Sequence, residues 1–212
     1  MEDESRTDLT ELSDLQLDAL KEIANIGAGN AATAFSQMLD QRIDMSVPKV
    51  DIKPLNEIPE ILGGPESLVV GILVEVMGDI PGKILFALDE KSANRMTSLL
   101  LDKRLNNVDK QDEKIKKSTL KELGNILTNS YLNALSRMTN LSPLPSVPGL
   151  ALDMAGAILE VAFLQVGYIG DYALVVETEF WDGEDRISGN FFFIPTPESL
   201  NKILSKLGVG QI

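Results

Sequence analysis

The apolar residues of the chain recur with two different periods, and the first period is helical. After the acidic segment 1–12, apolar residues return every three or four positions from Asp14 to Asp40, which predicts a long amphipathic helix. Ser13 is the expected N-cap of this helix, with Gln16 completing a capping box. The expected buried stripe consists of Leu20, Ile23, Gly27, Ala31, Ala34 and Met38.

The pattern then becomes that of strands. The segment 42–55 is extended and interrupted by Pro48, which suits an edge strand or a bend between two short strands. Residues 56–66 are expected to form a loop. The Val- and Ile-rich segment 68–89 predicts a hairpin that turns at residues 78–82, and its weak alternation indicates a buried central sheet. A helix from Glu90 to Leu101 is expected to close this half of the chain.

The same order of patterns returns after a polar linker at 106–112. The expected elements are a helix over 112–139, a proline-rich extended segment over 141–154, a hairpin over 157–181 that turns at Gly170-Asp171, a strand over 187–195 and a helix over 196–209 with Thr196 as its cap. The buried stripe expected for the long helix consists of Leu120, Leu123, Leu127, Tyr131, Ala134 and Met138.

Each half is therefore predicted to consist of a helix, strands and a second helix. We expect one α+β domain over residues 13–212, preceded by a mobile acidic lead over residues 1–12. The domain is expected to contain two repeats, at about 13–105 and 112–212, related by pseudo-twofold symmetry. A central, mostly antiparallel sheet pairs strands across the halves, and the two long helices carry the motifs described next.

Four polar positions of the first half recur 100 residues later at the same spacing. The first set is Asp18, Glu22, Asn25 and Pro48, and the second set is Ser118, Glu122, Asn125 and Pro148. From average residue usage, a random start position matches this pattern roughly once in 10^5 tries. The repetition indicates a duplicated unit with one polar site in each half.

The helical members of each set share one face, opposite the apolar stripe. Asp18, Glu22 and Asn25 are spaced i, i+4 and i+7, and their counterparts in the second half have the same spacing. A single Glu-x-x-Asn on a helix is usually a solvated surface. Asparagine is a poor interior helix former, however, so its presence at the same place in both helices favours a functional role.

Composition narrows the possible chemistry. The chain of 212 residues has no cysteine and no histidine, which excludes disulfides, thiolate metal sites and Ser-His catalysis. Its net charge of -13 argues against nucleic-acid binding, because a phosphate backbone requires clustered Lys and Arg. No apolar run approaches the roughly 20 residues of a membrane span, and the N-terminus is not a secretory signal. We expect a cytoplasmic protein without membrane insertion.

A glutamate and an amide on a rigid helix are suited to completing the active site of a partner. No nucleophile is paired with a base in this sequence, and no metal cage is evident. An amide can hold a water in line with a scissile bond, and a glutamate can pair with a cation on the partner. Such a design suits phosphoryl hydrolysis, in which catalysis is mainly positioning and electrostatics.

The segments 18–39 and 119–138, each followed by its proline, closely resemble the CheC/CheX/FliY family of bacterial and archaeal chemotaxis. Members of this family are phosphatases of the phosphorylated response regulator CheY. The resemblance implies that Glu22 and Glu122 pair with the active-site lysine of CheY. It also implies that Asn25 and Asn125 enter the phosphorylation site and orient the attacking water. Two complete motifs and a short chain favour the CheC type.

The resemblance assigns supporting roles to the other repeated positions. Asp18 and Ser118 are expected to support the motif face, and Pro48 and Pro148 to shape the adjoining strand entry. No cofactor is expected on this chain itself, and the Mg2+ of the reaction is expected in the CheY active site.

The resemblance also implies a second partner, the receptor deamidase CheD. The segment 151–156, with Asp153, is a possible CheD-docking element or simply a turn at the entry to the sheet. Two alternatives to the phosphatase remain at this point. One is a non-catalytic scaffold like the FliM middle domain, and the other is an adaptor that sequesters CheD.

Glycines set the first motif helix apart from the second. Gly27 lies on the apolar stripe and is expected to allow close packing. Gly29 lies nearer the polar side, where packing and close approach of a partner are equally good explanations. The second helix has Leu127 to Ser130 in place of the Gly-Ala-Gly-Asn run, so the two sites need not be equally active.

Overall fold

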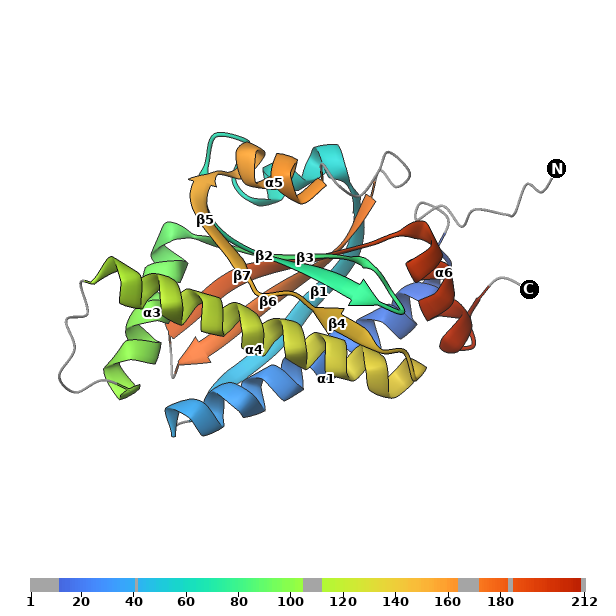
Figure 1. Cartoon of the computed structure of the whole chain (residues 1–212), viewed down its shortest axis with the longest axis horizontal. Helices are drawn as coiled ribbons and strands as arrows, with labels where there is room; N and C mark the ends of the chain where they lie inside the picture. Colours follow the sequence, from blue (N-terminus) through green and yellow to red (C-terminus); the bar gives the residue numbers. More distant parts are fainter. Residues whose placement is uncertain (1–11, 41, 105–111, 164–171, 183–184, 211–212) are drawn as a thin grey trace.

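A single antiparallel sheet forms the centre of the molecule, with helices on both of its faces (Figure 1). The computed structural model describes residues 12–40, 42–104, 112–163, 172–182 and 185–210. The strands are β1 (Asp44–Pro54), β2 (Leu68–Gly78), β3 (Gly82–Asp89), β4 (Pro143–Pro145), β5 (Gly149–Met154), β6 (Tyr172–Asp182) and β7 (Asp185–Pro195). The helices are α1 (Asp14–Leu39), η2 (Leu55–Glu57), α2 (Ile58–Ile61), α3 (Glu90–Arg104), α4 (Glu113–Thr139), α5 (Ala155–Phe163) and α6 (Pro197–Lys206).

The order of the strands is the same when the two halves of the chain are exchanged. The sheet runs β1-β6-β7-β3-β2, and both β4 and β5 pair with the outer side of β2. When the halves are exchanged, the pairing of β1 with β6 corresponds to the pairing of β5 with β2. In the same way, the pairing of β6 with β7 corresponds to the pairing of β2 with β3. The halves meet at β3 and β7, where Phe86 lies opposite Phe191. The predicted α+β fold with pseudo-twofold symmetry is confirmed, while the residue limits of the repeats stay a prediction.

Two apolar layers cover the two faces of the sheet. The larger layer joins α1, α3, α4 and α6 to one face. The smaller layer packs Ile58 of α2 and one side of α5 against the other face, on residues such as Leu85 and Phe192. α1 and α4 lie side by side on the first face and run in opposite directions (Figure 1). Each motif helix therefore buries one side in the main core.

The long helices begin where the sequence predicts. The Ser13 hydroxyl accepts the backbone N–H of Gln16 and the Gln16 side chain accepts that of Ser13, so the capping box is present. Asp112 caps α4 by accepting the N–H of Lys114. The expected stripe of α1 needs a correction at its end, where Phe35 is buried and Met38 only partly so.

Two segments of the sequence prediction are wrong. Residues 155–163 are the helix α5 and do not form the first arm of a hairpin, because Ala155, Ile158, Leu159 and Ala162 make a helical stripe that is buried against the sheet. The expected loop at 56–66 contains the end of η2 and the short helix α2, which Ile58 anchors in the smaller core. The predicted turn at Gly170-Asp171 lies outside the described residues.

The segment around Pro48 forms one strand and not two. β1 is an edge strand, as predicted, and its pairing with β6 shifts register between Ser46 and Lys49. The shift spans Pro48, which has no N–H to give to a ladder. An irregular pairing thus replaces the expected break.

Candidate functional site

The polar side chains of the first motif are all exposed along α1. Asp18, Glu22 and Asn25 face solvent, while Leu20 and Ile23 between them are buried. The side chains of Glu22 and Asn25 form no hydrogen bond or ion pair with any described residue. The carboxylate and the amide are therefore free to contact another molecule.

The second motif occupies the same face of α4 but differs in detail. Ser118 and Glu122 are exposed, whereas Asn125 is half-buried. The Asn125 amide donates a long hydrogen bond of 3.5 Å to Oε2 of Glu122. One turn later, Nδ2 of Asn129 donates to the backbone carbonyl of Asn125 at 2.8 Å. The second carboxylate-amide pair is thus partly engaged within its own helix.

The two motifs form two separate sites. Leu20 and Ile23 of α1 line the same core void as Leu132 and Leu135 of α4, so the first half of α1 lies beside the second half of α4. Since both motifs belong to the first halves of antiparallel helices, they lie toward opposite ends of the helix pair (Figure 1).

Each repeated proline lies in the region beside its own motif helix. α1 packs against β1, which contains Pro48, and α4 packs against β5, which begins directly after Pro148. Pro148 is buried. The role of both prolines in shaping the strand entry stays a prediction.

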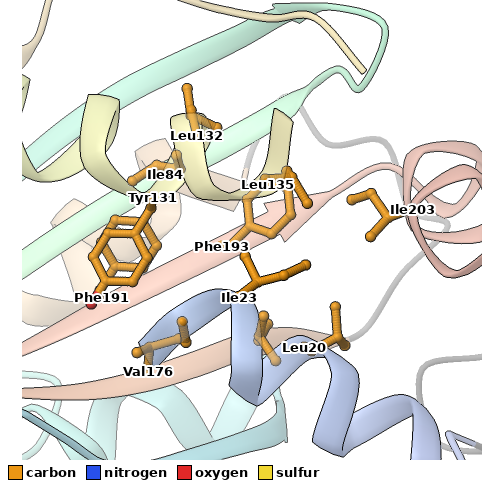
Figure 2. Close-up of a pocket in the computed structure, with 12 residues that line it drawn as sticks. Leu20, Ile23, Ile84, Tyr131, Leu132, Leu135, Val176, Phe191, Phe193 and Ile203 are labelled. Atoms are coloured by element: carbon orange, nitrogen blue, oxygen red, sulfur yellow. The ribbon is translucent and has the colours of Figure 1, made fainter. Parts of the chain in front are cut away.

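A small void in the main core lies between the helix pair and the sheet (Figure 2). Its volume is about 40 Å³ and its walls are apolar, so it has room for little more than one water and few groups to bind one. Tyr131 lines it and stacks on Phe191 with ring centroids 4.2 Å apart. This void is a packing defect and not a ligand site.

The Tyr131 hydroxyl is the most perturbed acid in this core. Burial raises the pKa of Tyr131 to about 12, and the nearby Thr178 hydroxyl opposes the shift. The hydroxyl makes no hydrogen bond of ordinary geometry with the residues that the structure describes. It lies on the buried side of α4, away from the motif, and is not a candidate catalytic acid.

Asp153 lies at the exposed end of β5. Its Oδ1 accepts the backbone N–H of Met154 at 2.8 Å. Asp153 and Val161 line a groove of about 310 Å³ that runs between β5 and α5. On the opposite face of the same strand end, Leu152, Met154 and the neighbouring Leu68 of β2 are large, exposed apolar side chains. This edge of the sheet is a second candidate surface.

Neither a metal-binding cluster of acidic side chains nor a membrane-spanning helix is found in the part of the chain that the structure describes. Within the described ranges, no three acidic side chains are grouped so that they could hold a metal ion. None of the helices found there is long and apolar enough to cross a membrane.

Comparison with solved structures gives the class of the fold. FliY of Thermotoga maritima superposes with a TM-score of 0.74 at 22% identity, covering 95% of this chain and 100% of that one. FliM in the FliM-SpeE complex of H. pylori superposes with a TM-score of 0.64 at 18% identity, covering 93% and 97%. The chain thus has the fold shared by these two proteins.

Sequence comparison then gives the family. The CheC-like family matches residues 15–52 and 115–151, which contain both sets of repeated polar positions. The protein called CheY-P phosphatase CheC of Bacillus subtilis (strain 168) is 34% identical over 196 residues, covering 91% of this chain and 94% of the relative. The chain belongs to the CheC-like family.

Proposed function

We propose that this protein is a chemotaxis phosphatase that accelerates hydrolysis of the aspartyl-phosphate on the response regulator CheY. The observation that carries the proposal is the pair of Glu-x-x-Asn faces, each displayed on a helix whose other side is anchored in the core. Such anchoring keeps the side chains in place before the partner arrives. The B. subtilis relative named as a CheY-P phosphatase supports the choice of substrate.

In the proposed reaction, the asparagine amide of one motif holds a water in line with the phosphorus. The water oxygen forms a bond to phosphorus while the bond from phosphorus to the aspartyl oxygen breaks. The aspartate leaves as a carboxylate, and the water protons pass to the departing phosphate and to solvent. Asn25 and Asn125 act by position alone, because a neutral amide is too weak a base to take the proton.

The glutamates fix the register of the partner. Glu22 and Glu122 are proposed to pair with the active-site lysine of CheY, one helical turn from the amide that holds the water. Asp18 and Ser118 extend the same face by one further turn. The Mg2+ that phosphoryl chemistry requires is proposed to be held by CheY carboxylates.

A second partner is proposed for the exposed end of β5. Asp153 presents a carboxylate to the groove beside α5, while Leu152 and Met154 expose apolar side chains on the opposite face of the same strand end, so both charged and apolar groups are available there for a protein contact. We propose CheD as that partner, with both proteins in the cytoplasm. In a pull-down assay, retention of CheD by the wild type but not by Asp153→Ala would support this site. Equal retention by the two proteins would contradict it.

The decay of phosphorylated CheY tests the phosphatase. Wild type is compared with Asn25→Ala, Asn125→Ala and the double variant, at stoichiometric concentration. Loss of the water-positioning amide at both sites is expected to lower the acceleration by at least about tenfold. Asn133→Ala is a matched control, because Asn133 is exposed on α4 outside the motif.

The alternatives predict different results. If neither wild type nor the double variant changes CheY decay, with CheD present or absent, the phosphatase proposal is wrong. A non-catalytic FliM-like scaffold would then explain the two faces as docking surfaces. CheD binding without any effect on CheY would favour the adaptor.

A further inference from the structure

On their exposed faces, the two motifs differ at the residue four positions after the asparagine. In α1 this residue is Gly29, and a Cβ built there meets nothing within 4 Å. In α4 it is Asn129, whose Nδ2 donates to the Asn125 carbonyl at 2.8 Å. The surface beside Asn25 is therefore bare, whereas a side chain lies beside Asn125.

Helix geometry explains why this residue matters to the motif. Side chains on a helix lean toward its N-terminus, so residue i+4 covers the turn that carries residue i. The hydrogen bond of Asn129 holds its amide over that turn. On α1 the corresponding bond lies one turn farther on, where the Thr33 hydroxyl donates to the Gly29 carbonyl at 2.9 Å.

The exposure and hydrogen bonding of the two asparagines also differ between the motifs. Asn25 is exposed, and its side chain forms no hydrogen bond with a described residue. Asn125 is half-buried, and its amide donates to Glu122. To receive a partner, the second site must break or rearrange bonds that the first site does not have.

Gly29 also lacks the packing reason that accounts for the other glycine of its helix. A Cβ on Gly27 would overlap the ring of Tyr131, so that position excludes larger residues. No neighbour excludes a side chain at Gly29, although glycine weakens a helix interior. Close approach of another molecule to the backbone remains as the reason for this glycine.

We propose that Gly29 and Asn129 determine access to the two sites, so that the first site receives phosphorylated CheY more readily and the Asn129 side chain restricts the second. Both act as specificity-determining residues outside the reacting groups. This inference rests on the proposed phosphatase function.

Single-site proteins test the inference. Asn25→Ala leaves only the second site, and adding Asn129→Ala is expected to lower its KM for phosphorylated CheY several-fold with little change in kcat. Asn125→Ala leaves only the first site, and adding Gly29→Asn is expected to raise its KM several-fold. A structural role would not move KM in opposite directions at the two sites.

Asn133→Ala is the matched control, because it removes the same exposed side chain one turn beyond Asn129, and it is not expected to change KM. Gly29→Ala adds only a methyl group to the surface beside Asn25 and is expected to raise KM less than Gly29→Asn does. If the single-site proteins are active but Asn129→Ala and Gly29→Asn leave KM at the control values, the access inference is overturned and the phosphatase stands. If neither single-site protein accelerates the decay of phosphorylated CheY, the phosphatase proposal and the access inference are both wrong.

Discussion

Gly27 lies directly against the ring of Tyr131. A Cβ built on Gly27 would be 2.5 Å from Cδ1 of Tyr131, and the same ring stacks on Phe191. The missing side chain thus allows α1 and α4 to approach each other while Tyr131 stays packed on the sheet. The separation of the two motif helices depends on this contact.

Gly27→Ala is expected to destabilise the fold. Overpacking costs about 1–3 kcal/mol, and the better helix propensity of alanine offsets about 1 kcal/mol of this, so a net loss of up to about 2 kcal/mol is expected. The measurement is urea unfolding at equilibrium. Gly29→Ala is the control and is expected to stabilise the protein by about 1 kcal/mol, because its Cβ meets no neighbour. Equal effects at the two positions would contradict the packing explanation.

The raised pKa of Tyr131 predicts that the folded protein loses stability at alkaline pH. The pKa of Tyr131 is raised by burial from 10.0 to about 12, so the folded protein keeps the phenol proton longer than the unfolded chain does. The stabilising contribution is full below about pH 10 and is lost as the pH rises toward about 12. Across that window, about 2–3 kcal/mol is expected to disappear.

The Tyr131→Phe variant isolates this effect. Near pH 8 its stability is expected to lie within about 1 kcal/mol of wild type, because the buried hydroxyl has no hydrogen-bond partner of ordinary geometry among the described residues. Urea unfolding at pH 8 and pH 11.5 is expected to show a smaller loss in the variant by about 2 kcal/mol. Equal losses in both proteins would mean that Tyr131 titrates normally.

The charge of the motif glutamate is expected to matter for binding CheY. Glu22→Gln in the protein that keeps only the first site should raise KM about tenfold, since a bond between charged groups becomes one to a neutral amide. The KM of the variant should also depend less on salt. Glu198→Gln, on the exposed surface of α6, is the matched control. An unchanged KM and salt dependence would exclude a lysine partner for Glu22.

Local signals in the sequence determined where the motif helices begin and which way they face. Ser13 with Gln16 marks the start of α1 because capping groups are satisfied within one turn. The helical period places Glu22 and Asn25 opposite Leu20 and Ile23, so their exposure follows from spacing alone. The repetition of the polar positions likewise predicted two halves, which the pairing of the strands confirmed.

Tertiary contacts decided what local patterns left open. The short apolar run at 155–163 suits a buried strand or a buried helix equally, and only the sheet face beneath it selects the helix α5. Gly27 and Gly29 are both glycines and are only two positions apart. A Cβ on Gly27 would overlap Tyr131, whereas a Cβ on Gly29 would meet open space. The antiparallel course of α1 and α4 places the two motifs apart, because helix direction depends on packing across the sheet and not on the sequence of either helix.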